Sequence, residues 1–343
     1  MLYISSRNKT DSFTSHRTLC GDHAPDGGQY LPYQLPQIEE EALVKMCMQS
    51  FGQNVAQILN LFFSASLSAW DVDCCIGRAP ARVKAMNHRI LTAECFHNPQ
   101  NSYRYLVESL SRHLTQGKTG EATVWMRIAI RISVLFALYA LLPEDVREGF
   151  DICLPTGDFS DPMAAWYARR MGLPIRKIIC CCNENSAVWD LLQRGEMNTG
   201  MPVVDTGMKE LDHACPAQIE RLIYHTLGLE QTQAFLAVCQ KKGVFRIEEE
   251  SFEKISDGFS AAVVGRERIP TTIRSVYRSN QYFVSPVAAV VFGGLQDFRA
   301  KSGESQHTLI LADDSPACYA DQVSAVCGIT KAELSKALTS VKE

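Results

Sequence analysis

The sequence shows no excess of positive charge. Its 343 residues include 34 lysines and arginines against 38 aspartates and glutamates, which gives a net charge of −4 at pH 7. Binding to nucleic acid calls for a basic surface, and binding to an anionic membrane calls for a polybasic segment. The sequence has neither, so we expect no nucleic-acid partner and no membrane partner.

The sequence also lacks the cysteine spacings of a metal site or a disulfide framework. It contains 13 cysteines, an odd number, and no two of them have the CxxC spacing. Several stand within or beside apolar runs, as at residues 180–182. This pattern is typical of reduced thiols in a cytosolic protein. The first ten residues contain no apolar run, so we expect no secretory signal and a cytoplasmic location.

No stretch of the sequence has the composition of a membrane span. The nearest is residues 125–142, WMRIAIRISVLFALYALL, in which Arg127 and Arg131 share one helical face. Lipid tolerates arginine poorly at such positions. Only the eleven residues from Ile132 are nearly free of polar groups, and that length is typical of a buried helix. We therefore predict a helix in the protein core.

What the sequence does contain is enough apolar surface for a sizeable core. Hydrophobic residues make up 46% of the chain, and its length suggests two or three domains. Residues 1–75 open with polar, turn-rich sequence and continue into an amphipathic helical stretch, EEEALVKMCMQSFGQNVAQILNLFF. Residues 76–124 are polar and helical in pattern, with little β-rich sequence. Residues 125–343 hold the core helix and the strand-like runs.

One stretch, FDICLPTGDFSDPMAAWYARRMGLPIRKIICCC at residues 150–182, predicts a βαβ unit. Two apolar runs form its strands. Ser160 or Asp161 can cap the helix between them, and Gly172 ends it. A further strand, TLILA, follows near the C-terminus. We therefore predict an α/β fold, with an open, twisted, mainly parallel sheet and flanking helices.

The loop PTGDFSD of this unit is a natural place for an anion, because N–H groups at a helix start point outward. Asp158 works against that use. A phosphate at about 4 Å would be repelled by roughly 4 kcal/mol at an effective dielectric near 20. The same residues also fit a well-capped helix start that binds nothing. Composition alone leaves both interpretations open.

Motifs along the chain resemble, in the same order, those of one enzyme family. YISSRN and APDGGQYLP resemble Y-x-S-T-R-G and A-P-D-G-G-L-Y-x-P, and ECFHNPQNSYRY resembles E-L-F-H-G-P-T-x-A-F-K-D. WMRIAIRISVLFALY is similar to a helix that begins N-W-x-R. PTGDFSDPMAAWYARRMGLPI, with NEN after it, resembles P-T-G-N-F-G-D-x-x-A-G-Y-x-A-x-x-M-G-L-P-I and N-E-N-D. LDHACPAQIERLIY resembles M-D-I-x-x-P-S-N-F-E-R-L, and LADDSPACYADQV resembles S-T-A-H-P-A-K-F.

These motifs are those of threonine synthase, a pyridoxal-phosphate enzyme of the tryptophan-synthase-β type (fold type II). The chain therefore resembles threonine synthase, as a truncated and degenerate relative. The resemblance implies an N-terminal helical segment of that family at residues 1–75 and a reduced remnant of its small domain at residues 76–124. It implies the α/β large domain at residues 125–343.

The main departure lies at the family's coenzyme-binding lysine, where this sequence has Arg104. Tyr105 follows in place of an aspartate. An imine needs a neutral primary amine, and a guanidinium stays protonated at any workable pH. Arg104 therefore cannot replace the lysine in covalent catalysis. It can still bind an anion through two N–H groups, or lie on the surface as an ordinary arginine; both interpretations stay open.

The family's phosphate cup is altered as well. In place of G-N-F-G-D the sequence has an acid and a serine where the family has asparagine and the second glycine, and glycine is what lets a backbone approach closely. Asp313 replaces a threonine that the family places beside the pyridine ring. We therefore expect either no coenzyme or weakly held pyridoxal phosphate. The residues that the resemblance assigns to the cup are Gly157, Asp158, Phe159, Ser160 and Asp161.

The family's substrate loop, A-T-S-G-D-T-G, resembles LTQGKTGEAT at residues 114–123. The loop lies close in sequence to Arg104 and Trp125, which predicts that elements of the mobile small domain are missing on both sides. Without them, the lid that excludes water from the reaction would be absent. Lys118 is either a relocated Schiff-base lysine or an exposed loop lysine. The remnant of the substrate loop is Gly117, Lys118, Thr119 and Gly120.

Three functions follow from the resemblance and its departures. The first is a threonine synthase-like protein that has lost pyridoxal-lysine catalysis and has a binding or partner role. The second is a pyridoxal-dependent lyase of amino-acid biosynthesis that acts on phosphohomoserine or a related amino acid. The third is a subunit that pairs with an intact threonine synthase, or with a second copy of itself, through the surface that a missing domain would uncover.

Overall fold

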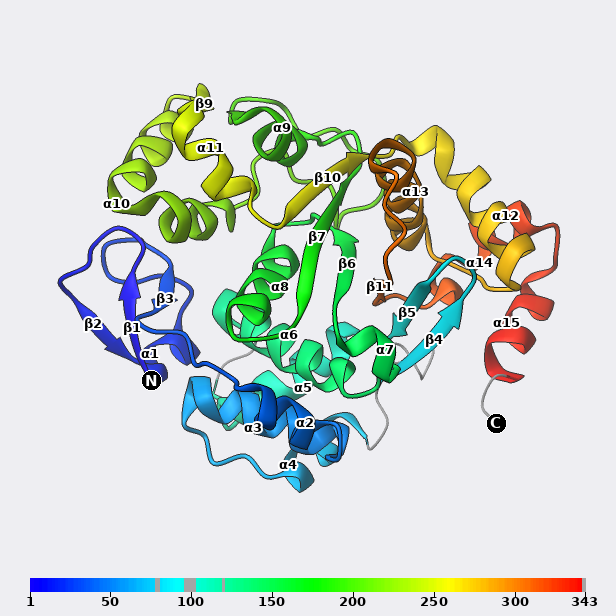
Figure 1. Ribbon diagram of the computed structural model, residues 1–343, viewed down its shortest axis with the longest axis horizontal. Helices are drawn as coiled ribbons and strands as arrows, with labels where there is room; N and C mark the ends of the chain where they lie inside the picture. Colours follow the sequence, from blue (N-terminus) through cyan, green and yellow to red (C-terminus); the bar gives the residue numbers. More distant parts are fainter. Residues whose placement is uncertain (78–80, 96–102, 119–120, 341–343) are drawn as a thin grey trace.

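The computed structural model describes residues 1–77, 81–95, 103–118 and 121–340. At its centre lies a six-stranded sheet with the strand order β10-β7-β6-β11-β5-β4 (Figure 1). Neighbouring strands run parallel, except that β4 pairs with β5 in the antiparallel direction. The strands are β4 (Arg82–Met86), β5 (Ile90–Glu94), β6 (Phe150–Pro155), β7 (Ile175–Cys182), β10 (Phe259–Val263) and β11 (Thr308–Ala312).

The central sheet separates two hydrophobic cores. Side chains alternate between the faces of a strand, so along β7 Ile178 and Cys180 join one core while Ile179 and Cys181 join the other. A sheet buried on both faces explains the continuous apolar run IRKIICCC. The predicted open, mainly parallel sheet with flanking helices is confirmed. The helices α6 (Val124–Tyr139) and α8 (Ser160–Arg170) pack in the first core, and α12 (Ile269–Asn280) and α13 (Pro286–Ser302) pack in the second.

The predicted core helix is α6, which ends three residues before the predicted boundary. The Thr123 hydroxyl oxygen caps it by accepting a hydrogen bond from the Met126 N–H at 3.2 Å. Nearly all of its side chains are buried, including Arg131, whereas Arg127 is exposed. Among the helices of the described residues, none is long and apolar enough to cross a membrane.

Residues 1–75 contain β-structure that the sequence did not predict. A three-stranded antiparallel sheet, in the order β2-β1-β3, precedes the helices. Its strands are only three or four residues long, which is too short for an alternation of apolar and polar residues to predict them. The predicted helical stretch divides at Ser50, whose side chain forms a capping box with Gln53. The elements are β1 (Leu2–Ser5), β2 (Ser12–Thr14), α1 (Ser15–Cys20), β3 (Tyr30–Pro32), α2 (Glu40–Met46), α3 (Phe51–Phe63) and α4 (Ala69–Ile76).

The prediction of helical sequence at residues 76–124 is wrong for the hairpin of β4 and β5. β5 pairs with β11, more than 200 residues later in the chain, and so belongs to the central sheet. The alternation in RVKAM and ILTAE is weak because the hairpin lies at the sheet edge and carries charged residues. The division into a small-domain remnant and a large domain stays a prediction.

The remaining elements surround the sheet at its two ends. Figure 1 shows α10 and α11 near the N-terminal sheet, and α12, α14 and α15 at the opposite end with the C-terminus. Within α10, Gly228 has a φ of 87° and kinks the helix. These elements are α5 (Tyr103–Leu114), α7 (Glu144–Arg147), α9 (Ala187–Arg194), β8 (Glu196–Asn198), α10 (Ile219–Gln240), β9 (Val244–Arg246), α11 (Glu249–Ser256), η1 (Arg266–Arg268), η2 (Pro316–Tyr319), α14 (Ala320–Cys327) and α15 (Lys331–Ser340).

Candidate functional site

The segments that follow the parallel strands meet at one edge of the central sheet. Asp158 and Asp161 follow β6, and Asp313 is the first residue after β11. Tyr103, the first residue of α5, joins them because its N–H donates a hydrogen bond to the Asp313 carbonyl at 3.3 Å. Open α/β sheets bind ligands at the carboxyl ends of their strands. This edge is therefore the candidate functional site.

The predicted phosphate cup, residues 157–161, contains a carboxylate of its own at the helix start. Asp158 Oδ1 accepts a hydrogen bond from the Ser160 N–H at 2.9 Å. Asp158 Oδ2 lies 3.3 Å from Nη2 of Arg127. The Ser160 N–H is one of the groups with which the first turn of α8 would hold an anion. The Asp158 side chain thus turns toward the cup and occupies part of it.

The start of α8 differs from the prediction. Neither Ser160 nor Asp161 caps the helix; the N-cap is Phe159, with φ 71° and ψ 12°. This left-handed conformation is uncommon for a bulky residue, and the fully buried Phe159 ring holds it in place. Gly157 also has a positive φ, and a Cβ there would approach the Glu210 carbonyl oxygen to 3.0 Å. The segment around Glu210 therefore lies directly against the cup loop.

A buried arginine from α6 links two of the acidic residues at this edge. Nε and Nη2 of Arg131 donate to the two oxygens of Asp161 at 2.8 and 3.2 Å. Nη1 and Nη2 donate to the two oxygens of Asp313, the first at 3.1 Å. The Arg131 guanidinium carbon lies 3.3 Å from the centre of the Tyr103 ring. Burial alone would lower the pKa of Arg131, but the carboxylates of Asp161 and Asp313 outweigh it and hold that pKa well above its usual value.

Arg104, at the position of the family's lysine, lies on the outer surface of α5. Its side chain is 85% exposed, and its Nε lies 2.8 Å from the Glu108 carboxylate one turn along the helix. That hydrogen bond raises the pKa of Arg104 above its already high usual value. Of the two interpretations left open by the sequence, this position fits the ordinary surface arginine.

The lysines of the described residues are exposed or only partly buried. Lys118 is exposed in the turn after α5, where its N–H donates to the Thr115 carbonyl at 3.0 Å. Gly117 before it has a φ of 73°, as such a turn requires. Thr119 and Gly120 of the predicted substrate loop lie outside the described residues. None of the described lysine side chains is buried.

Asp314 lies next to the Arg131 cluster. Burial raises its pKa to about 6, and the neighbouring carboxylates of Asp313 and Glu210 contribute to the shift. Burial likewise raises the pKa of the Tyr319 hydroxyl. The carboxylates of Asp313, Asp314 and Glu210 therefore make this part of the sheet edge acidic.

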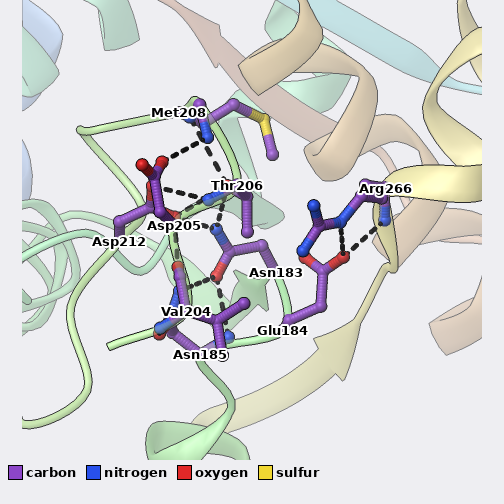
Figure 2. A network of polar contacts seen from close by, with 10 residues as sticks. Asn183, Glu184, Asn185, Val204, Asp205, Thr206, Met208, Asp212 and Arg266 are labelled. Carbon is purple, nitrogen blue, oxygen red and sulfur yellow. Dashed lines mark hydrogen bonds and ion pairs between the residues drawn. The ribbon is translucent and has the colours of Figure 1, made fainter. Parts of the chain in front are cut away.

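A polar clamp, made of Asn183, Asn185, Thr206 and Asp212, holds the segment that covers the cup (Figure 2). The Asn183 side-chain amide donates to Asp212 Oδ1 at 2.7 Å and to the Thr206 hydroxyl at 2.9 Å. The Asn185 side-chain amide donates to the same Asp212 oxygen at 3.2 Å. Asp212 Oδ2 accepts from the Thr206 N–H at 3.0 Å. The motifs NEN and LDHACP, separate in the sequence, thus meet in one structure.

A second buried network joins the N-terminal motifs to the start of α10. Glu220 accepts hydrogen bonds from the Ser6 hydroxyl and from Nε of Arg7, the latter at 3.3 Å. Arg221 donates to the Tyr30 carbonyl. The motifs YISSRN, APDGGQY and PAQIERL therefore contact one another. Both networks preserve the frame around the site and lie outside its centre.

The residue that sequence analysis missed at the centre is Arg131. The two arginines of the core helix were noted only as an argument against a membrane span. A charged residue on an otherwise apolar helix must find a carboxylate in the core, and that rule is the signal that could have found it. The partners Asp161 and Asp313 come from segments 30 and 182 residues away in sequence, so spacing did not reveal them.

Comparisons with known proteins agree with this architecture. The family model for the threonine synthase N terminus matches residues 2–79. The solved, pyridoxal-phosphate-bound threonine synthase of Brucella melitensis superposes with a TM-score of 0.84 at 20% identity, over 96% of this chain and 92% of that one. The chain is related to threonine synthase. Its fold is that of threonine synthase structures, pyridoxal-enzyme fold type II.

Two curated relatives extend the comparison. Human Threonine synthase-like 1 is 31% identical in an alignment of 166 positions, gaps included, that covers 44% of this chain. The match spans only 22% of that relative's length, about a fifth. Mouse Threonine synthase-like 2 is 20% identical in an alignment of 436 positions, gaps included, that covers 96% of this chain and 90% of that protein. Threonine synthase-related sequence thus extends along nearly the whole chain.

The residues at the sheet edge of this threonine synthase-related protein do not fit pyridoxal phosphate. A carboxylate, from Asp158, already accepts an N–H of the cup. Asp313, which the resemblance places beside the pyridine ring, is bonded on both oxygens to Arg131. The lysine position carries the exposed Arg104. A phosphate in the cup would meet the Asp158 carboxylate, Asp313 is already engaged by Arg131, and Arg104 points to solvent and offers no primary amine.

Proposed function

We propose that this protein does not carry out the pyridoxal-lysine reaction of its relatives and that it serves as a non-catalytic binding or partner protein. The observation that carries the proposal is Arg104, which stands where the family has its lysine and points to solvent with Glu108 as its partner. A guanidinium remains protonated and delocalised, so it does not attack an aldehyde.

Two further observations support the proposal. The described residues contain no buried lysine, although a buried amine is what desolvation would activate for imine formation. In the cup, Asp158 brings a negative charge to the place of the phosphate. At about 4 Å that charge would cost roughly 4 kcal/mol. Covalent and non-covalent attachment of the coenzyme are therefore both disfavoured.

The alternative is a pyridoxal-dependent lyase that acts on phosphohomoserine or a related amino acid. It requires another lysine to form the imine, and Lys118 is the candidate in the remnant of the substrate loop. The exposed position of Lys118 in a turn favours the non-catalytic interpretation. A lysine in solvent is not desolvated, so burial does not activate its amine for imine formation.

An assay of phosphate release separates the two functions. Purified protein is mixed with pyridoxal phosphate and phosphohomoserine, and the threonine synthase of Brucella melitensis serves as the positive control. We expect no release above the background of the coenzyme alone, for the parent chain and for Arg104→Lys alike. Arg104→Lys stays inactive because it places an amine on the outer face of α5. Saturable turnover by the parent chain, lost in Lys118→Arg, would establish the lyase instead.

The partner role is tested by recovery from the native cell. We propose a cytosolic protein, on the ground that all 13 cysteines are free thiols. Its partner would be an intact threonine synthase or a second copy of itself. Gentle purification of the tagged chain should recover one of these in stoichiometric amount. Recovery of the chain alone, as a monomer at micromolar concentration, would remove the partner role.

A further inference from the structure

Arg131 is held as a bound ligand would be. Its side chain is 1% exposed, while its partners Asp161 and Asp313 keep 27% and 24% exposure. All three guanidinium nitrogens are used, in two bidentate pairs, and Nη2 bonds both carboxylates. A carboxylate that accepts two parallel N–H groups of a guanidinium adds geometric specificity to the charge, because the rigid fork of donors matches its two oxygens.

The Arg131 guanidinium is contacted on its flat face by an aromatic ring, in addition to the carboxylates that bind its N–H groups. The Tyr103 ring lies 3.3 Å from the Arg131 guanidinium carbon, so the cation rests against an aromatic surface. The Tyr103 hydroxyl is buried, with no hydrogen-bond partner in the described part of the chain. Burial raises the pKa of this hydroxyl well above its usual value, so the ring stays neutral. The pocket formed by Asp161, Asp313 and Tyr103 is shaped and charged for one planar cation.

We propose that Asp161, Asp313 and Tyr103 form a binding site for a guanidinium-type cation and that the chain fills this site with its own Arg131. The inference rests on the proposed function only in that no coenzyme takes up the same space. The resemblance associates this edge of the sheet with an anionic coenzyme. In the proposed arrangement the edge instead binds a cation, the Arg131 side chain of the same chain. Four segments, from α5, α6, α8 and the end of β11, are joined by that ligand.

The test is replacement of the resident cation by a free one. Arg131→Ala leaves two carboxylates without their partner, which should lower the unfolding temperature, and opens a cavity between them. Ethylguanidinium, which reproduces the end of the arginine side chain, should bind there and raise the unfolding temperature of the variant at millimolar concentration. Ethylammonium carries the same charge without the planar fork and should raise it much less. Neither cation should stabilise the parent chain or the control Arg104→Ala, in which an exposed arginine is removed.

Each outcome of this experiment either supports or overturns the proposed cation site. Saturable stabilisation of Arg131→Ala by ethylguanidinium, lost when Asp313→Ala is added, supports the site. Equal effects of the two cations, or no effect on a folded Arg131→Ala, overturn it, as does stabilisation of that variant by pyridoxal phosphate instead. If Arg131→Ala does not fold in buffer, its refolding with and without ethylguanidinium is compared, and failure to recover overturns the proposal. None of these readouts involves an aldehyde or a lysine, so a covalent coenzyme adduct would remove the proposed function and leave this test standing.

Discussion

Asp158 occupies the first turn of α8 in the way that a bound anion would. Its carboxylate accepts the Ser160 N–H and lies beside Arg127. The sequence alone predicted that Asp158 stands in the cup loop and would repel a phosphate, because this loop is a local motif within one βαβ unit. It did not predict which way the side chain turns, since that depends on Arg127 in another helix.

Asp158→Asn should therefore restore part of the anion site. An asparagine keeps the hydrogen bond to the Ser160 N–H but removes the charge that repels an anion. The variant should bind inorganic phosphate at least about tenfold more tightly than the parent, because the repulsion at about 4 Å is roughly 4 kcal/mol. Titration calorimetry measures the affinity, with the exposed Asp145→Asn as the control. Equal affinities for phosphate in Asp158→Asn and the parent would show that the Asp158 carboxylate does not repel anions from the cup.

Asp314 gives a pH-dependent prediction at the same scale. Its pKa is raised to about 6 by burial and by neighbouring carboxylates. The stability that its neutral form confers is therefore complete below about pH 4, the unfolded value, and is lost as the pH rises through about 6. Asp314→Asn should stabilise the protein at pH 7 by about 1–2 kcal/mol, given roughly 1.4 kcal/mol per pKa unit and partial exposure.

Denaturant unfolding at pH 4 and pH 7 checks the Asp314 prediction. The stabilisation should shrink toward zero at the lower pH, where the parent carboxyl is neutral. Asp145→Asn, which removes an exposed acid, should show no such dependence. A stabilisation of Asp314→Asn that is the same at both pH values would contradict the raised pKa.

At the scale of secondary-structure elements, local signals predicted some elements and long-range pairing created the others. The βαβ unit was predicted because apolar runs, a helix start and Gly172 are neighbours in the sequence. The β4–β5 hairpin was missed because its identity as a pair of strands depends on β11. The Arg131 cluster was missed for the same reason: its members come from α5, α6, α8 and the end of β11 and meet only in the folded chain.

The polar clamp makes a prediction about the segment over the cup. Asp212→Ala removes the acceptor for Asn183, Asn185 and Thr206 at once and should destabilise the fold by about 2–3 kcal/mol. Amide hydrogen exchange should speed up at the Thr206 N–H. Asp205→Ala is the matched control, because Asp205 lies exposed in the same segment and, within the described part of the chain, accepts a hydrogen bond from the Gly207 N–H at 2.9 Å and takes no part in the clamp. Unchanged exchange at Thr206 in Asp212→Ala would show that the clamp does not hold this segment.

At the scale of the whole molecule, the residues that build the frame keep the threonine synthase-like motifs, whereas residues of the site depart from them. The buried networks around Glu220 and Asp212 keep the motifs that resemble threonine synthase, and the fold superposes on solved threonine synthases. At the centre, Asp158 and Asp313 depart from those motifs, and Arg104 departs from them on the outer face of α5. The frame maintains the shape of the protein through packing and buried hydrogen bonds, which do not require the coenzyme.

The most direct test of the central claim is a search for a covalent coenzyme adduct. The full chain is incubated with pyridoxal phosphate, reduced with borohydride and mapped by peptide mass spectrometry, beside the Brucella melitensis threonine synthase as a positive control. The account predicts only scattered, substoichiometric modification of exposed lysines in this chain. One mole of coenzyme per mole of protein on a single lysine, at Lys118 or elsewhere, would contradict it.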